Sequence, residues 1–158
     1  MINLVLHNRT RVRIYGESFF RRICDATAPY LPAGKAGLGA PKGHFIEIGL
    51  SLVGQSAIRK LNRTYRHKDT STDVLSFPLH MKPIPGYTAI SLGDLFISPR
   101  DVVAKAAFTG QSVRKQMQWT VIHGLLHLAG YDHQRGVVAA RKMFALERSI
   151  LKKLTTDH

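Results

Sequence analysis

The sequence is poor in cysteine and acidic residues, and it has no long apolar run. Cys24 is the only cysteine among 158 residues, which excludes an internal disulfide and a metal site built from several thiolates. The longest uncharged apolar stretches are shorter than the roughly 18 to 20 residues that cross a bilayer. Residues 1–6 are too short for a signal-peptide core. We therefore expect a cytosolic protein that does not span a membrane.

The shortage of acidic residues leaves a strongly basic chain. Ten aspartates and glutamates face 23 lysines and arginines, so the net charge is +13 and the pI is near 10.4. Basic side chains that neutralise phosphates release condensed counterions on binding, so this excess favours a polyanionic partner. An anionic membrane surface would satisfy the same charge. Composition alone therefore leaves nucleic acid and membrane surface as alternatives.

The apolar fraction of 44% is enough for one sizeable core, and we expect a single domain over residues 1–158. Alternating apolar residues predict strands, and apolar residues three and four apart predict helices. The predicted strands cover residues 2–6, 44–53, 74–77 and 92–97. The predicted helices cover residues 16–30, 55–66, 100–108, 111–129 and about 137–154. Roughly four strands in a mixed sheet with about five helices predict an α+β fold.

Two connections are rich in glycine or proline. The segment between residues 32 and 43 has several glycines but lacks the spacing of a phosphate-binding P-loop, so we expect a surface loop there. The prolines and glycine between residues 77 and 92 predict a long hairpin connection between two strands.

The segment from His123 to His133 contains three histidines in a metal-binding pattern. His123 and His127 are four residues apart, so on a helix their side chains lie on one face and can converge on one ion. Gly130 can end the helix in a left-handed conformation, and the following turn can bring His133 back as a third ligand. Three nitrogens leave a fourth position open. An open position is typical of catalytic zinc, whose bound water ionises near pH 7. The pattern therefore predicts one zinc ion.

The same spacing occurs in metzincin proteases, which place a glutamate directly after the first histidine as general base. Here that position is Gly124. Without a carboxylate to activate water, a metallopeptidase becomes a minor alternative.

Two longer segments, in this order, resemble the YbeY family of bacterial rRNA maturation factors and metallo-endoribonucleases. The first is residues 61–78, Leu-Asn-Arg-Thr-Tyr-Arg-His-Lys-Asp-Thr-Ser-Thr-Asp-Val-Leu-Ser-Phe-Pro, and the second is residues 123–133. A weaker match, residues 92–95, lies between them. The resemblance implies a zincin-like domain that cleaves single-stranded RNA in 16S rRNA 3′-end maturation and ribosome quality control. It also implies ribosomal RNA and the small ribosomal subunit as partners.

Carried over residue by residue, the resemblance makes His123, His127 and His133 the metal ligands and Arg66 the arginine linked to activity. A guanidinium can meet two nonbridging phosphate oxygens with parallel hydrogen bonds, which suits phosphodiester cleavage. Residues 59–68 hold five lysines and arginines. We expect Arg66 to face the metal while the other four contact the RNA backbone, although a solvated surface explains any one of them equally well. These four are Arg59, Lys60, Arg63 and Lys68.

Several further residues around the histidines are candidates for other roles. Asp73, Asp94 and Asp132 are candidates to accept the second imidazole N–H of a ligand, and the sequence does not rank them. We expect Trp119, one turn before His123, to pack against the core. Many family members have an acidic run after the third histidine, whereas here residues 134–142 read Gln-Arg-Gly-Val-Val-Ala-Ala-Arg-Lys. This difference favours nonspecific RNA affinity and leaves protein partners unknown.

A second hypothesis of another class is an assembly protein that binds rRNA without cutting it, with a zinc ion that is chiefly structural. The open coordination position argues against this hypothesis, but a fourth ligand could come from elsewhere in the fold.

Overall fold

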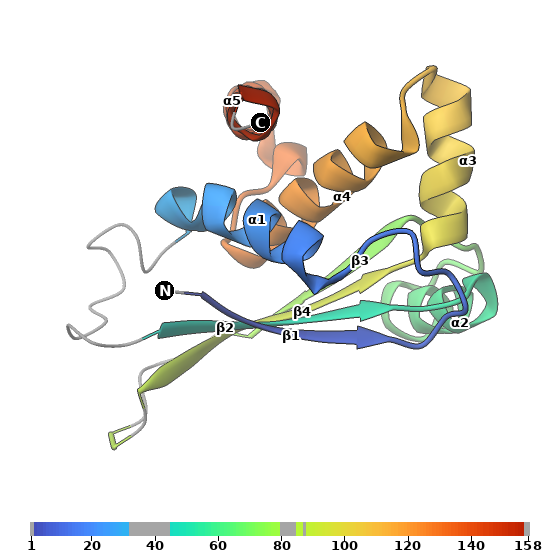
Figure 1. Ribbon diagram of the computed structural model, residues 1–158, viewed down its shortest axis with the longest axis horizontal. Coiled ribbons are helices and arrows are strands. Elements are labelled where there is room, and N and C mark those ends of the chain that lie inside the picture. The colour runs from blue at the N-terminus through green and yellow to red at the C-terminus, as the bar shows by residue number, and fades with distance from the viewer. Residues whose placement is uncertain (1, 32–44, 80–84, 87, 157–158) are drawn as a thin grey trace.

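The computed structural model describes residues 2–31, 45–79, 85–86 and 88–156, and its centre is a four-stranded sheet (Figure 1). The strands are β1 (Ile2–Asn8), β2 (Phe45–Leu52), β3 (Val74–Pro78) and β4 (Ala89–Ile97). They lie in the order β1-β2-β4-β3. β1, β2 and β4 are parallel, and β3 is antiparallel to β4. The glycine-rich segment expected as a surface loop falls outside the described residues.

The two faces of the sheet differ in polarity because side chains alternate along each strand. In β2, Ile46, Ile48, Leu50 and Leu52 are buried, while the residues between them are half-buried. The pairing of β3 with β4 runs from Val74 opposite Ile97 to Pro78 opposite Gly93, as expected for two strands joined by a hairpin connection. The mixed sheet predicted from the sequence is therefore confirmed.

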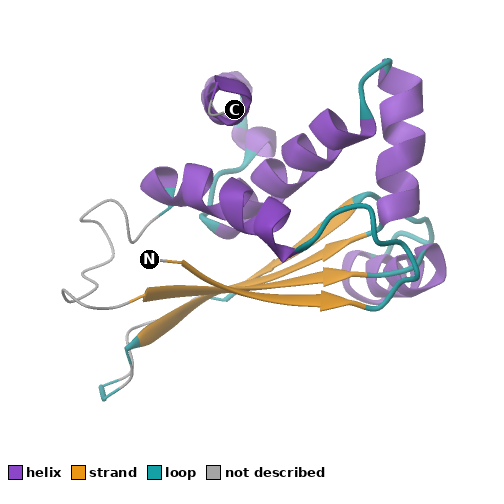
Figure 2. Ribbon diagram, viewed as in Figure 1, coloured by secondary structure: helices purple, strands orange, loops and turns teal. Residues whose placement is uncertain are grey.

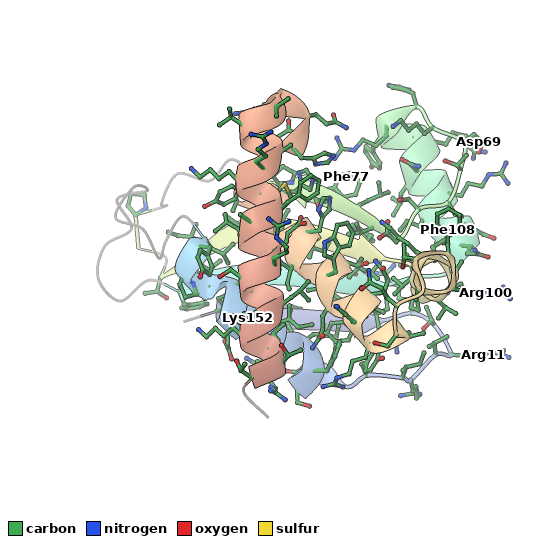
Figure 3. The ribbon with its side chains drawn as sticks, turned by 90° about the horizontal axis from the view of Figure 1, so that it is seen from above. Arg11, Asp69, Phe77, Arg100, Phe108 and Lys152 are labelled. Carbon is green, nitrogen blue, oxygen red and sulfur yellow. The ribbon has the colours of Figure 1, made fainter. Side chains whose placement is uncertain are left out.

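The helices are α1 (Glu17–Thr27), α2 (Gln55–Arg66), α3 (Pro99–Thr109), α4 (Val113–Leu128) and α5 (Val137–Thr156). α1 and α4 lie over one face of the sheet, and α5 lies farther out on the same side (Figures 1 and 2). Seen from above, α5 crosses over α4 and α1 (Figure 3). α4 is therefore enclosed by other elements, which explains why Val121, Ile122, Leu125 and Leu126 are all fully buried.

α2 contributes to a smaller, separate cluster of buried side chains. Val53, Ile58 and Leu75 form this cluster, and Phe77 and Phe96 pack against it from β3 and β4. Leu95 and Ile97, the neighbours of Phe96 in β4, belong instead to the main core with α1, α4 and α5. Alternate residues of β4 thus face the two clusters, and the last turn of α2 is held beside β3.

Cys24 is completely buried in α1, and its burial raises the pKa of the thiol to about 12.

Among the described residues, no helix is both long and apolar enough to cross a bilayer.

Candidate metal centre

The end of α4 presents His123 and His127 one turn apart, and both imidazoles are half-buried. The helix ends in a Schellman motif, in which the Gly130 N–H donates to the His127 carbonyl at 3.0 Å and the Tyr131 N–H to the Leu126 carbonyl at 3.0 Å. This motif requires a left-handed residue, and Gly130 has φ +92°. The chain reverses there and enters a short 3-10 helix, His133–Arg135, whose first residue returns beside the other two histidines.

The three imidazoles are close enough to hold a metal ion. One nitrogen from each of His123, His127 and His133 lies within 4.8 Å of the other two. The Nε2 atoms of His123 and His127 are 3.1 Å apart. Two nitrogens bound to one tetrahedral zinc at about 2.05 Å would be about 3.3 Å apart. The Nδ1 atom of His133 is buried, with no hydrogen-bond partner in the described structure. The donor set and its spacing therefore fit a tetrahedral metal with three histidine ligands.

The protonation state of His127 also suits a metal. Burial lowers the pKa of this imidazole below its ordinary value of 6.5, and the neighbouring His123 and His133 lower it further. A lowered pKa keeps the imidazole neutral at neutral pH. Neutral imidazole is the form that binds metal ions.

The histidines open onto a pocket of about 670 Å³, large enough for a small-molecule or nucleotide-sized group. Residues from the end of α2, from the chain leading into β3, and from α4 line it together. Arg66, in the last turn of α2, is one of them. Its Nη2 atom donates to the Ser76 carbonyl at 2.7 Å, and its guanidinium lies 5.5 Å from the centre of the Phe77 ring. The fold therefore places Arg66 in the same pocket as the three histidines.

The other basic residues singled out near Arg66 differ in their surroundings. Arg59 donates twice to Asp69, at 2.9 and 3.1 Å, and Arg63 lies 3.7 Å from the same carboxylate. The Arg59 guanidinium holds the pKa of Asp69 below its usual value. Lys68 lines the pocket, whereas Lys60 is exposed on α2 outside it. Two of the four cations thus share one acidic partner.

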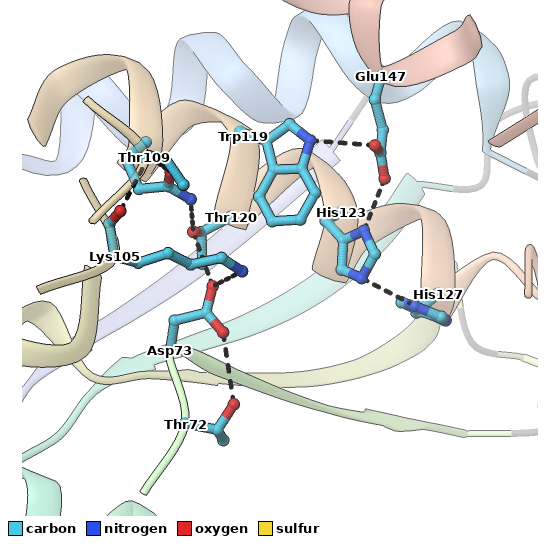
Figure 4. Close-up of polar contacts among 10 residues, drawn as sticks. Thr72, Asp73, Lys105, Thr109, Trp119, Thr120, His123, His127 and Glu147 are labelled. Carbon is cyan, nitrogen blue, oxygen red and sulfur yellow. Dashed lines mark hydrogen bonds and ion pairs between the residues drawn. The ribbon is translucent and has the colours of Figure 1, made fainter. Parts of the chain in front are cut away.

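An acidic side chain contacts His123, but it is none of the three expected aspartates. Oε1 of Glu147, in α5, lies 2.6 Å from Nδ1 of His123 (Figure 4). Asp73 instead accepts from Lys105 at 3.2 Å and from Thr120 at 3.1 Å.

The remaining two aspartates, Asp94 and Asp132, likewise make no hydrogen bond to a ligating imidazole among the described residues. Asp132 caps the 3-10 helix by accepting from the Gln134 N–H at 2.8 Å. Asp94 points to the exposed face of the sheet, over Gly49. The expectation that an aspartate holds a ligating imidazole therefore disagrees with the structure.

Comparison with known proteins supports the resemblance seen in the sequence. The family model described as "Endoribonuclease YbeY" matches residues 16–155. The chain belongs to this YbeY family. A YbeY protein of Persephonella marina is 41% identical over 109 residues, covering 69% of this chain and 71% of the relative. One of Aquifex aeolicus is 38% identical over 110 residues, covering 70% and 71%.

A solved structure shows the same fold. The solution structure of a Thermotoga maritima protein superposes with a TM-score of 0.60 at 24% identity, over 99% of this chain and 91% of the other. The α+β fold expected for a YbeY protein is thereby confirmed.

In this YbeY family member, two residues have contacts that the sequence did not predict. Trp119 lines the pocket and stacks on His123, with ring centres 4.7 Å apart, instead of packing in the core. Glu147 is buried on the face of α5 that also carries Met143, Ile150 and Leu154. An acidic residue within an apolar helical stripe is an unusual feature because burying an unpaired charge is costly. That signal could have identified Glu147 before the structure.

Proposed function

We propose that this protein is a zinc-dependent endoribonuclease specific for single-stranded RNA, which acts in the cytoplasm in 16S rRNA 3′-end maturation and ribosome quality control. The observation that carries this proposal is that three converging imidazoles and the guanidinium of Arg66 share one pocket. Membership of a family described as endoribonucleases supports the choice of RNA as substrate. The net charge of +13 is consistent with a polyanion.

In this proposal His123, His127 and His133 hold one zinc ion. A bound zinc would act as a Lewis acid towards the phosphate, and the attacking group would be either water or the ribose 2′-hydroxyl. The protein side chains hold and orient the scissile phosphate. The end of α4 and the 3-10 helix fix the three nitrogens, while the rest of the pocket leaves room for a nucleotide.

Arg66 is the proposed catalytic side chain. Cleavage concentrates negative charge on the nonbridging phosphate oxygens, and a guanidinium can stabilise that charge with two parallel hydrogen bonds. One N–H of Arg66 already donates to the Ser76 carbonyl, and this contact orients the rest of the group. The Phe77 ring beside it restricts its movement further.

Arg59, Lys60, Arg63 and Lys68 are the proposed contacts to the RNA backbone. Lys68 is the nearest of these to the scissile phosphate in this proposal because it lines the pocket. Arg59 and Arg63 already neutralise Asp69, so each adds less new attraction for RNA than an unpaired cation. For single-stranded RNA, removing one phosphate contact lowers the slope of log affinity against log salt by about 0.7. Lys68→Ala should show this change more fully than Arg63→Ala.

Ribosomal RNA in the small subunit is the proposed partner, and the proposal includes no membrane contact. Residues 134–142 carry three basic side chains, Arg135, Arg141 and Lys142, and no acidic one. All three side chains are exposed. This surface next to the histidines suits a phosphate backbone better than a basic protein partner.

The proposal is tested by cleavage of a single-stranded RNA and its duplex form by zinc-loaded wild type, His123→Ala and Arg66→Ala. Loss of a group that stabilises transition-state charge typically costs about 100-fold or more in rate, and we expect this for Arg66→Ala. Arg100→Ala is the matched control because Arg100 is an exposed arginine at the outer edge of the molecule, in α3 (Figure 3). His123→Ala also detects contaminating nuclease, which would cut equally in every preparation.

Other outcomes would support different functions. Equal cleavage by all variants at equal purity would exclude the proposed reaction. RNA binding without cleavage, together with a zinc ion that resists chelation, would indicate a structural zinc in a ribosome-assembly factor. Casein hydrolysis would indicate a peptidase. The structure argues against this outcome, because a side chain at position 124 would point at Leu95 and Val74 and leave no room for the metzincin glutamate.

A further inference from the structure

The contacts of Glu147 single it out among the acidic residues of this basic chain. Its side chain is 2% exposed and lies in α5, which crosses over α4. Each of its two carboxylate oxygens meets a ring nitrogen of α4. Oε1 lies 2.6 Å from Nδ1 of His123, and Oε2 accepts from Nε1 of Trp119 at 3.0 Å. Both oxygens therefore have hydrogen-bond partners one helical turn apart on α4 (Figure 4).

These contacts define how the His123 ring presents its second nitrogen. A buried carboxylate accepts hydrogen bonds, so the proton of a neutral His123 ring belongs on Nδ1. Nε2 is then left with a free lone pair. That atom is the one that lies 3.1 Å from Nε2 of His127, on the side where the three histidines converge. The contact with Glu147 thus selects the tautomer in which His123 can donate to a metal.

Trp119 fixes the carboxylate in turn. A glutamate side chain has several rotatable bonds, and one hydrogen bond alone leaves it free to turn. The indole N–H holds the second oxygen, and the indole ring stacks on the His123 imidazole at an interplanar angle of 21°. Lys105 lies 4.5 Å from the centre of the Trp119 ring and pairs with Asp73, which limits movement of the indole.

We propose that Glu147 is a positioning residue for the metal centre, which holds His123 in its metal-binding tautomer and orientation and is itself held by Trp119. This inference rests on the proposed metal binding by the three histidines. Carboxylates that accept from the second nitrogen of a ligating histidine typically affect metal affinity by 10- to 100-fold. A purely structural role, in which Glu147 only joins α5 to α4, would lower stability without changing metal affinity or tautomer.

The test measures the zinc dissociation constant by competition with a chromophoric chelator for wild type, Glu147→Gln and Trp119→Phe. We expect Glu147→Gln to bind zinc about 10- to 100-fold more weakly because an amide also offers N–H groups and no longer selects one tautomer. Trp119→Phe keeps a stacked ring but loses the indole N–H. We expect this variant to bind zinc about 3- to 10-fold more weakly than wild type, a smaller effect than that of Glu147→Gln. Glu17→Gln, which alters an exposed carboxylate of α1, is the charge-matched control and should bind as wild type.

A second readout is independent of metal loading. Nitrogen NMR of the histidine rings in the metal-free protein should show the Nδ1–H tautomer for His123 in wild type and a mixture in Glu147→Gln. Zinc binding within twofold of wild type by both variants, or an unchanged tautomer in Glu147→Gln, would overturn the proposal. If Glu147→Gln does not fold, the zinc affinity of Trp119→Phe and the tautomer of His123 in wild type still decide the proposal. Failure of the proposed function would appear differently, as wild-type protein that binds no zinc or cuts no RNA.

Discussion

Replacing Gly124 tests how closely α4 lies on the sheet beneath the metal centre. Gly124 directly follows His123, and it is buried. A Cβ atom added there would lie 2.8 Å from Cδ2 of Leu95 and 3.2 Å from Cγ2 of Val74. Both distances are shorter than ordinary van der Waals contacts. Leu95 is fully buried, so it has little space into which to move.

Two opposing effects determine the stability of Gly124→Ala. Alanine is favoured over glycine in a helix interior by about 1 kcal/mol. Overpacking of a close-packed core costs about 1 to 3 kcal/mol. The balance is a net loss of about 1 kcal/mol, which corresponds to a fall in Tm of about 2 to 4 °C for a chain of this size. Gly124→Glu should not fold stably because a carboxylate buried between Leu95 and Val74 would cost several kcal/mol.

The assay is thermal and urea unfolding of metal-free Gly124→Ala beside wild type. Ala107→Gly, at an exposed position of α3, is the reverse substitution without a packing contact, and it measures the helix preference of alanine over glycine alone. This variant should lose about 1 kcal/mol of unfolding free energy. The reasoning is refuted if Gly124→Ala gains as much stability as Ala107→Gly loses, since this would mean that the new methyl group meets no neighbour. A stable, folded Gly124→Glu protein would contradict it as well.

Two further predictions concern the sheet and α1. Gly93 has φ +134°, and a Cβ there would lie 2.3 Å from the Phe77 carbonyl oxygen, whereas Gly86 has φ +87° and space for a Cβ, so Gly86→Ala should cost about 1 to 3 kcal/mol from backbone strain alone. Gly93→Ala should therefore lose clearly more stability towards urea than Gly86→Ala, and equal losses would argue against the clash. Cys24 should resist iodoacetamide at pH 8.5 until the protein unfolds, and fast alkylation of native protein would show that the thiol is accessible. Folding raises the pKa of the Cys24 thiol from 9.0 to about 12. The contribution of this thiol to the free energy of unfolding should therefore be complete below pH 9 and lost towards pH 12.

Local sequence patterns predicted most of the helices and strands, and the errors of the prediction lie at the ends of these elements. The helix expected over residues 111–129 begins at Val113, because the Ser112 side chain accepts from the Lys115 N–H at 3.1 Å and caps it. The helix expected over residues 16–30 ends at Thr27, and a 3-10 turn containing Pro29 follows. β4 begins at Ala89 rather than at residue 92. Such boundaries depend on capping and strand pairing, which periodicity does not contain.

The candidate site was predicted in part, for a physical reason. His123, His127 and the glycine turn before His133 are close in sequence, so helix geometry alone brings them together. The contact of Glu147 with His123 joins α5 to α4 across 24 positions, and it depends on the angle at which the two helices cross. Local patterns do not contain that angle. Arg66 reaches the pocket through the packing of α2 beside β3, and the sequence placed it there only by resemblance to the YbeY family.

The most direct test of the central claim is a zinc titration of metal-free protein in which bound zinc and cleavage of a single-stranded RNA are measured on the same samples. We predict that the cleavage rate rises in proportion to bound zinc up to one equivalent per chain and then stays constant. His123→Ala should show neither tight binding nor cleavage, because two imidazoles remain of the three that converge. Cleavage that is independent of added zinc, or equal in His123→Ala, would contradict the claim.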